Sequence, residues 1–228
     1  MRPYIICHML SSIDGRIQGD VLANVTVDGE YERTGSALNG DAWICGRTTM
    51  QMHFADKKRF VPRRQTPAGR RPVFVARHAK SYAISVDTLG KLRWSSSDIS
   101  GDHIICIVSE SASADYLAML QARNISYIVS GRRSVDLSRG MQLLRKHFGV
   151  RRLLLEGGGK INGGFLEAGL IDELSLLLVP GIDGRREVPT VFDNIHPTLR
   201  RAARMKLLSV EKRKGSTLWL RYKMMHTT

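Results

Sequence analysis

The sequence predicts one α/β domain with a mostly parallel sheet and an antiparallel C-terminal end, and three observations lead to that prediction. Short, unbroken apolar runs alternate with helix-like segments of about ten residues, as in parallel sheets that are covered on both faces. Two apolar runs near the C-terminus are separated only by a Lys/Gly turn, which is typical of an antiparallel hairpin. No internal repeat or linker interrupts the 228 residues, so we expect a single domain over residues 1–228.

In the first quarter of the chain, two strands flank one helix. Tyr4–Met9 is a short apolar run with β-branched residues, and the polar loop SSIDGR follows it. Asp28–Leu38 begins with an N-cap residue and ends at Asn39-Gly40, which is the pattern of a helix with a glycine stop. Ala42–Cys45 is the second predicted strand.

Strands and helices alternate after residues 55–71, which are rich in Lys, Arg, Pro and Gln and predict an exposed loop. Helices are predicted where apolar side chains recur at helical spacing. The predicted strands are 73–76 (VFVA), Ile104–Val108, 126–130 (SYIVS), Arg152–Leu155 and Glu173–Pro180. The predicted helices are 109–123, 135–149 and Ile161–Ala168. The predicted hairpin joins Met205–Val210 to Thr217–Tyr222 through the turn Lys212–Ser216.

The formal net charge of +14 is compatible with nucleic acid, an anionic surface or small anionic ligands as partners. The basic residues stand in scattered groups without interleaved aromatics, and no helix-turn-helix, RNA-recognition or zinc-finger signature occurs. We therefore expect mainly solvated loop charge with some phosphate contacts, and we do not favour nucleic acid as the partner. The groups are Arg63-Arg64, Arg70-Arg71, Arg132-Arg133, Arg151-Arg152, Arg185-Arg186, Arg200-Arg201 and Lys212-Arg213-Lys214.

The sequence carries no pattern for membrane insertion, secretion or metal binding. No apolar run approaches the roughly 18 residues of a membrane span, and Asp14 follows the short N-terminal apolar run without a cleavage site, so we expect a cytoplasmic protein. Cys7, Cys45 and Cys106 fit no zinc pattern and are expected to be small core residues. His8 is expected to be packed rather than catalytic. The histidines without ligand spacing are His53, His103, His147, His196 and His226.

The most informative run is LLLEGGGKINGGFLEAG, Leu153–Gly169, at a predicted strand-to-helix junction. Glycines there let the backbone approach a phosphate, and the helix N-terminus offers free N–H groups. The spacing Gly157-x-Gly159-x-x-Asn162 is one residue short of a Rossmann fingerprint, but its late position and the acids that begin the next strand exclude that assignment. We predict a phosphate cradle; glycines that only permit tight strand-to-helix packing are the alternative.

Polar residues follow several predicted strands at the ends where ligands bind in open α/β sheets. Glu156 is predicted to hydrogen-bond a substrate hydroxyl or amine, with a solvated carboxylate as the alternative. A second glycine at a predicted strand-to-helix junction occurs in Gly46-Arg47-Thr48-Thr49. A third predicted strand end carries basic residues, in the run Val75-Ala76-Arg77-His78. Together these junctions predict a ligand with several phosphates, although a solvated position suits Arg77 equally well. In the loop after the first strand, Ser12, Asp14 and Arg16 are predicted to face a polar substrate, with a plain turn as the alternative.

Three runs, CHMLSSIDGRI, DAWICGRTTM and LLLEGGGKINGGFLEAGLIDELSLLLVP, span most of the chain. Together they resemble the reductase domain of bacterial riboflavin biosynthesis, a member of the dihydrofolate-reductase-like superfamily. The resemblance implies a dihydrofolate-reductase-like fold, NADPH as cofactor and a homodimer. It also implies hydride transfer to the ribosyl C1 of a phosphorylated heterocycle, 5-amino-6-(5-phosphoribosylamino)uracil or its diaminopyrimidine analogue. The H-x-E and P-C-x-x-C motifs of the zinc deaminase often fused to these reductases do not occur, so we expect a stand-alone reductase domain.

The resemblance also implies residue roles. Gly158–Gly164 lie on the pyrophosphate side of NADPH, Thr49 contacts the cofactor, and Arg47 approaches the adenosine 2′-phosphate. Glu156 and Asp14 are the predicted catalytic residues, which orient the substrate and assist proton delivery; with Ser12 and Arg16 they form the predicted substrate site. The predicted cofactor-binding residues are Gly46, Arg47, Thr48, Thr49, Arg77, Gly157, Gly158, Gly159, Lys160, Ile161 and Asn162.

The chain departs from the family pattern at two places. The riboflavin enzymes usually carry an Asp pair after the second strand, where this chain has His53-Phe54 followed by Ala55-Asp56. They also carry a Trp between the first strand and the helix, and Asn24–Tyr31 has none. A pteridine or dihydrofolate-type reductase is therefore an alternative on the same scaffold. A non-catalytic, basic nucleotide- or nucleic-acid-binding protein is the alternative from another class.

Overall fold

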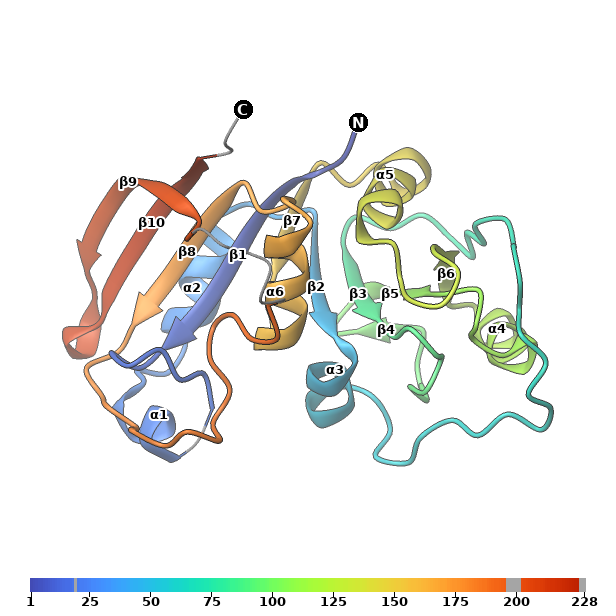
Figure 1. Cartoon of the computed structure of the whole chain (residues 1–228), viewed down its shortest axis with the longest axis horizontal. Helices are drawn as coiled ribbons and strands as arrows, with labels where there is room; N and C mark the ends of the chain where they lie inside the picture. Colours follow the sequence, from blue (N-terminus) through green and yellow to red (C-terminus); the bar gives the residue numbers. More distant parts are fainter. Residues whose placement is uncertain (19, 196–201, 226–228) are drawn as a thin grey trace. The chain divides into compact units, whose positions relative to one another are not determined.

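The computed structural model describes residues 1–18, 20–195 and 202–225 (Figure 1). Its backbone contacts divide into two compact units. Unit 1 comprises Met1–Pro3 and Asp41–Leu153, and unit 2 comprises Tyr4–Gly40 and Leu154–Thr228. Each unit combines strands and helices, which confirms the α/β class, while the single domain over residues 1–228 stays a prediction. His196, Arg200-Arg201 and His226, which the sequence singled out, lie outside the described residues.

The sheet of unit 1 is built on four parallel strands. β2 (Ala42–Gly46) pairs with β3 (Tyr82–Val86), β3 pairs with β5 (Asp102–Val108), and β5 pairs with β6 (Ser126–Val129). The short β4 (Asp98–Ile99) runs antiparallel to the start of β5. Because the four strands are parallel, their carboxyl ends share one edge of the sheet, which is the edge where α/β proteins bind ligands.

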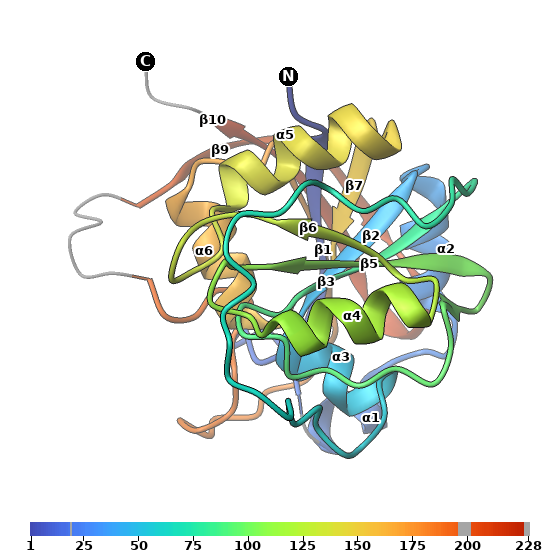
Figure 2. The same ribbon diagram turned by 90° about the vertical axis from the view of Figure 1, so that its right-hand side faces the viewer.

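Three helices of unit 1 follow these carboxyl ends: α3 (Arg47–His53), α4 (Ala114–Ala122) and α5 (Leu137–Phe148). The Ser113 side chain caps α4 and the Asp136 side chain caps α5, as their sequence patterns indicate. Figure 2 shows α4 and α5 on β6, against which both pack. The two predicted helices in this part of the chain are thus confirmed with shorter bounds.

The predicted strand at 73–76 is wrong. In that run only Phe74 forms an isolated bridge, with Tyr127, and the strand beside β2 is β3. The sequence of β3 is YAISV, in which small or polar Ala and Ser stand among larger apolar residues. The segment VFVA is more continuously apolar, and for that reason it was predicted as the strand instead. Ser85 in β3 is nevertheless fully buried, because the strand lies inside the sheet. The short β4 and α1 (Asp20–Val25) were not predicted either.

The sheet of unit 2 contains β1 (Tyr4–Ser11), β8 (Glu173–Leu178), β10 (Leu218–Met225) and β9 (Arg204–Lys212), in that spatial order. β1 and β8 are parallel, whereas β10 is antiparallel to both β8 and β9. The predicted C-terminal hairpin is therefore confirmed. The division between the units passes through β7 (Arg152–Leu155), which neighbours β1.

Two helices cover opposite faces of β1 in unit 2. In Figure 1, α6 (Gly159–Glu167) lies on the near side and α2 (Glu30–Ala37) on the far side, and Figure 2 shows the same arrangement from the side. Both helices were predicted from the sequence. Cys7 is buried in β1, and Cys45 and Cys106 are buried in unit 1, so the prediction of free core cysteines is confirmed.

A buried polar network packs His8 between β8 and α2. The His8 ring is fully buried and stacks on Tyr31, with ring centroids 4.4 Å apart. Its Nδ1 lies 3.0 Å from Ser175 Oγ, and its Nε2 lies 3.1 Å from the Tyr31 carbonyl oxygen. Trp219 Nε1 donates to the same Ser175 Oγ at 2.8 Å. His8 is thus a packed residue, as predicted, and its burial lowers its pKa to about 4.

Protonation of His8 is expected to destabilise the protein in mild acid. The native pKa of about 4 lies below the value of about 6.5 in an unfolded chain. Between pH 6.5 and pH 4, the unfolded state therefore binds a proton at this histidine that the native state does not bind. The free energy of unfolding is highest above pH 6.5 and decreases as the pH falls toward 4. The His8→Gln variant lacks this titration. Urea unfolding between pH 7 and 4 should show the wild type losing on the order of 3 kcal/mol more than the variant.

His53→Gln is the matched control, because His53 is exposed. This variant should follow the wild-type pH dependence. Identical slopes for the wild type and His8→Gln would contradict the assigned pKa.

Candidate active site

The predicted site residues are distributed over both units. Unit 2 contains Ser12, Asp14 and Arg16 with the run from Glu156 to Asn162, and unit 1 contains Gly46–Thr49 and Arg77.

Asp14 ties the loop after β1 to the loop after β8. Its carboxylate accepts hydrogen bonds from Ser12 Oγ at 2.6 Å and from the backbone N–H groups of Asp183 and Gly184 at 3.1 and 2.8 Å. These bonds, that of Ser12 foremost, hold the pKa of Asp14 far below its usual range. The carboxylate therefore stays ionised, which suits it to orienting a ligand and makes it a poor proton donor.

Arg16 fastens the same two loops at a second point. Its Nη1 donates to the Val188 carbonyl oxygen at 2.8 Å, and its Nε lies 3.8 Å from the Asp14 carboxylate. Its backbone N–H donates to Ser12 Oγ at 2.9 Å, and Ser12 is fully buried. These contacts give Ser12 and Arg16 a positioning role, while their direct contact with a substrate stays a prediction.

The glycine run begins α6 and packs closely on its surroundings. Gly157 has a φ of 82°, and a Cβ atom there would lie 2.9 Å from Met9 Cε on β1. A Cβ on Gly159 would overlap the Thr190 carbonyl oxygen, and one on Gly163 would overlap the Asp193 carbonyl oxygen. Tight packing, the alternative raised from the sequence, therefore accounts for Gly159 and Gly163.

The loop that contains Thr190 and Asp193 covers part of the start of α6. Asp193 N donates to the Gly159 carbonyl oxygen at 3.0 Å, and Thr190 Oγ1 donates to the Asp193 carboxylate at 2.6 Å. Asn162 is fully buried, and its Nδ2 donates to the Val191 carbonyl oxygen at 2.8 Å. Asn162 thus holds this loop, and the residues of the run that remain suited to a phosphate are the half-buried Gly158 and the exposed Lys160.

Glu156 directly follows β7 and is half-buried. The next residue, Gly157, lies against Met9 near the carboxyl end of β1. Glu156 therefore stands beside the edge of unit 2 from which the Asp14 loop begins. A carboxylate in that position can accept a hydrogen bond from a polar ligand.

In unit 1, Gly46 ends β2 and caps α3, which opens with Arg47, Thr48 and Thr49. The predicted glycine junction at this strand end is therefore confirmed as a structure. Sequence reasoning missed Asp87, a fully buried carboxylate just beyond β3 that accepts the Lys91 and Leu92 N–H groups at 2.6 Å each. Burial raises the pKa of Asp87, and the nearby charge of Arg47 acts in the opposite direction. The misplaced third strand concealed Asp87, because its run was not recognised as a strand end.

The phosphate junction predicted at Arg77 is wrong. No strand ends there, and Arg77 forms an ion pair with Asp98 of β4. Asp98 pairs with His103 at the amino end of β5. Arg77 thus lies at the opposite edge of the unit 1 sheet from Gly46–Thr49, so we remove it from the cofactor-binding set.

Among the described residues, the other acidic and histidine side chains do not form a further catalytic or metal-binding group. His53 is exposed and meets the Phe54 ring at 6.0 Å, while the neighbouring Asp56 forms an ion pair with Arg93 at 3.3 Å. Among the residues that the structure describes, no three His, Cys, Asp or Glu side chains are grouped so as to hold a metal ion. Within the same ranges, no helix has the length and apolar character needed to cross a membrane.

Two solved structures resemble this chain in fold. A pyrimidine reductase-like protein from Corynebacterium diphtheriae has a TM-score of 0.73 at 18% identity, covering 99% of this chain and 93% of that one. A diaminohydroxyphosphoribosylaminopyrimidine deaminase/5-amino-6-(5-phosphoribosylamino)uracil reductase from Thermotoga maritima has a TM-score of 0.66 at 16% identity, covering 98% of this chain and 57% of that one. These likenesses extend the shared fold over nearly the whole chain, including the antiparallel C-terminal strands.

Two relatives are similar in sequence. The 2,5-diamino-6-ribosylamino-4(3H)-pyrimidinone 5′-phosphate reductase of Methanothermobacter thermautotrophicus is 33% identical over 198 residues, which cover 85% of each chain. The protein of the same name from Archaeoglobus fulgidus is 26% identical over 197 residues, covering 85% of this chain and 87% of that one. Residues 3–218 match the model of the family described as the RibD C-terminal domain. This chain therefore belongs to the RibD C-terminal domain family.

Proposed function

We propose that this chain is an NADPH-dependent reductase of riboflavin biosynthesis, which transfers a hydride to the ribosyl C1 of a phosphorylated ribosylaminopyrimidine. The observation that carries the proposal is the family match over residues 3–218 together with a 33% identical relative named as such a reductase. Of the two substrates expected from the sequence, we favour the diaminopyrimidine form, because both relatives described above bear its name. Action in the cytoplasm remains part of the proposal.

Each unit by itself contains described residues that suit part of a dinucleotide cofactor. In unit 2, Gly158 caps α6 at a strand-to-helix junction and Lys160 is exposed there, and a helix N-terminus of this kind can approach a phosphate. In unit 1, Gly46 and the residues Arg47–Thr49 occupy the carboxyl edge of the parallel sheet. When bound, NADPH supplies the hydride, and the protein aligns donor and acceptor and excludes water.

The substrate groups belong to unit 2. Reduction at C1 opens the ribose ring, so the former ring oxygen takes up a proton. Asp14 remains ionised, so we assign it the orientation of polar substrate groups through the loops that it joins. Of the two predicted catalytic residues, Glu156 is therefore the one that we propose to assist this proton transfer.

The Glu156→Gln variant tests this assignment. Loss of a positioned acid or base lowers turnover by about 100-fold or more, whereas NADPH affinity should stay nearly unchanged. NADPH oxidation with the diaminopyrimidine substrate gives the turnover, and the fluorescence of bound NADPH gives the Kd. Glu167→Gln, an exposed change at the end of the same α6, is the control. Unchanged turnover in Glu156→Gln would reject the role.

A substrate panel separates the proposal from its alternatives. NADPH oxidation should occur with ribosylaminopyrimidine phosphates and should be absent with dihydropteridines; the reverse result favours the pteridine reductase. DNA affinity that falls steeply with salt, with no thermal stabilisation by NADPH, favours the nucleic-acid alternative instead.

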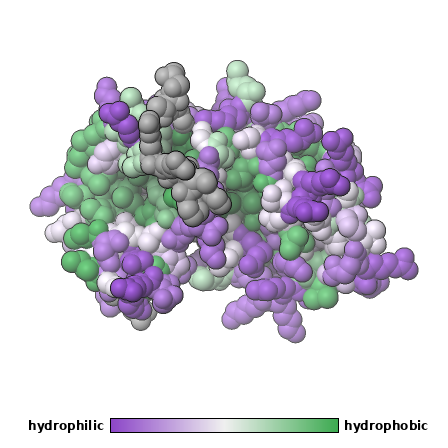
Figure 3. All heavy atoms as spheres, viewed as in Figure 1, coloured by the Kyte–Doolittle hydropathy of each residue, from purple (hydrophilic) through white to green (hydrophobic). Residues whose placement is uncertain are grey.

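We further propose that the chain forms a homodimer through one face of its C-terminal strands. Figure 3 shows apolar surface gathered over β8, β9 and β10. On β9, the exposed fractions are 43% for Met205, 49% for Leu207 and Leu208 and 52% for Val210. Val210 pairs with Leu220 on β10, which extends the apolar face. Exposed apolar patches of this kind mark interaction sites.

A charge placed on this face should separate the dimer. Leu207→Glu would bury a carboxylate in the interface without a partner, which costs several kcal/mol. Sedimentation or light scattering should show a wild-type dimer and a monomeric variant at the same concentration. Lys206→Glu, on the opposite face of the same strand, should leave the dimer intact. A monomeric wild type at tens of micromolar would contradict the proposal.

A further inference from the structure

Arg213, directly after β9, joins the C-terminal hairpin to the start of α2. Its Nε donates to the Glu30 carboxylate at 3.2 Å, and its Nη1 donates to the Glu211 carboxylate at 3.2 Å. Its guanidinium carbon lies 5.5 Å from the centre of the Trp219 ring. Glu30 is the first residue of α2, and only 5% of its side chain is exposed. Water therefore screens this ion pair less than it screens a pair on the open surface.

The turn of the same hairpin packs on the residues before α2. Gly215 has a φ of 63°, which glycine adopts without strain, and a Cβ atom on it would overlap Val27 Cγ2. The Val27 carbonyl oxygen in turn accepts the Glu30 N–H at 3.2 Å. The hairpin thus contacts the chain at two neighbouring points, through Val27 just before α2 and through Glu30 at its start.

The residues that lead into α2 lie at the substrate end of unit 2. Residues 20–29, which we call the α1 segment, comprise α1 and the turn before α2. Figure 1 shows α1 beyond the carboxyl ends of β1 and β8, the edge from which the Asp14 loop begins. Between that loop and the α1 segment, the Ile17 N–H donates to the Pro189 carbonyl oxygen at 3.0 Å. Contacts with the loop after β8 and with the hairpin therefore hold the α1 segment from both ends.

We propose that Arg213 is a positioning residue for substrate binding, an inference that rests on the proposed reductase function. By holding Glu30, Arg213 fixes the start of α2 and with it the α1 segment, which follows the predicted substrate residues in the chain. Arg33 also donates to the Glu30 carboxylate, at 2.9 Å, but it belongs to α2 itself and so cannot replace the link to the hairpin. Without that link, substrate binding must itself order the α1 segment, and this ordering lowers the affinity.

Arg213→Ala should raise KM for the diaminopyrimidine substrate by about fivefold to tenfold, while kcat and the Kd of NADPH change by less than about twofold, because the loss affects substrate binding alone. Arg213→Lys keeps a charged donor opposite Glu30 and should return KM to within about twofold of the wild type. Hydrogen exchange, followed by mass spectrometry, should be faster in residues 20–29 of Arg213→Ala than in the wild type.

Arg221→Ala is the matched control. Arg221 Nε donates to the Glu173 carboxylate at 2.7 Å, and its guanidinium carbon lies 5.8 Å from the centre of the same Trp219 ring. The exposed fractions of the two arginine side chains are 29% for Arg213 and 31% for Arg221, and that of each glutamate is 5%. Glu173 begins β8 and so lies at the opposite edge from the substrate loops. The control should lower stability toward urea by a similar amount without raising KM.

Circular dichroism verifies that each variant is folded, and Glu30→Gln, which weakens the same link from α2, replaces Arg213→Ala if that variant does not fold. An unchanged KM in Arg213→Ala, or an equal rise in Arg221→Ala, would overturn the inference. A wild type that reduces no ribosylaminopyrimidine phosphate would refute the proposed function. Faster exchange of residues 20–29 in Arg213→Ala but not in Arg221→Ala would in that case still support the anchoring of the α1 segment.

Discussion

The candidate active site in unit 2 depends on one ionised carboxylate, that of Asp14. Asp14 joins the loop after β1 to residues 183–184 after β8, and Arg16 joins the same loops at Val188. The chain then continues to Thr190 and Asp193, which pack on Gly159 at the start of α6. The position of the glycine run thus depends on a loop that Asp14 holds, so protonation or loss of this carboxylate would loosen the substrate side and the glycine run together.

Sequence patterns predicted the parts of the fold whose signal is local. The strand predicted at Tyr4–Met9, the helices predicted at 109–123 and 135–149 and the C-terminal hairpin were found because their apolar and turn residues lie close together in the chain. The third strand was misplaced because burial in the centre of a sheet comes from tertiary pairing, which lets Ser85 and Ala83 occupy a strand that apolar counting overlooks. That one error also produced the wrong role for Arg77 and concealed Asp87.

Site residues could be predicted from the sequence where they directly follow a strand. They could not be predicted where their position depends on contacts between loops that are distant in the chain. Glu156 and Gly46 follow strands in the sequence, so their edge of the sheet could be inferred. The partners of Asp14 lie about 170 positions away in the chain, and only the folded parallel pair β1–β8 brings them together. The run PGIDGRREVPT after β8 carried a usable signal, since an Asp- and Gly-rich loop behind a parallel strand belongs to the ligand edge. The glycines of residues 157–164 pack against a loop that is also distant in the chain. The sequence alone therefore could not show which of these glycines contact that loop and which face a ligand.

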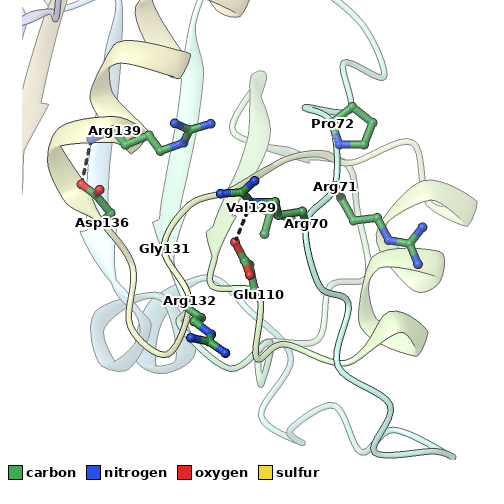
Figure 4. A pocket seen from close by; sticks show the side chains of 9 residues that line it. All are labelled: Arg70, Arg71, Pro72, Glu110, Val129, Gly131, Arg132, Asp136 and Arg139. Atoms are coloured by element: carbon green, nitrogen blue, oxygen red, sulfur yellow. Dashed lines mark hydrogen bonds and ion pairs between the residues drawn. The ribbon is translucent and has the colours of Figure 1, made fainter.

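The structure also divides the basic charge into two kinds. Several arginines are neutralised by a nearby acid, as in Arg221 with Glu173, Arg213 with Glu30 and Arg93 with Asp56. By contrast, the pocket of unit 1 that is lined by Arg70, Arg71, Arg132 and Arg139 contains only two carboxylates, those of Glu110 and Asp136 (Figure 4). A net charge of +14 is therefore uninformative until the paired arginines are set aside, because paired charge contributes little attraction for an anion at a distance. Part of the remaining charge lines this pocket, which lies on the ligand edge of a parallel sheet. The basic character that first raised nucleic acid as a partner is thus better explained by recognition of a small phosphorylated ligand.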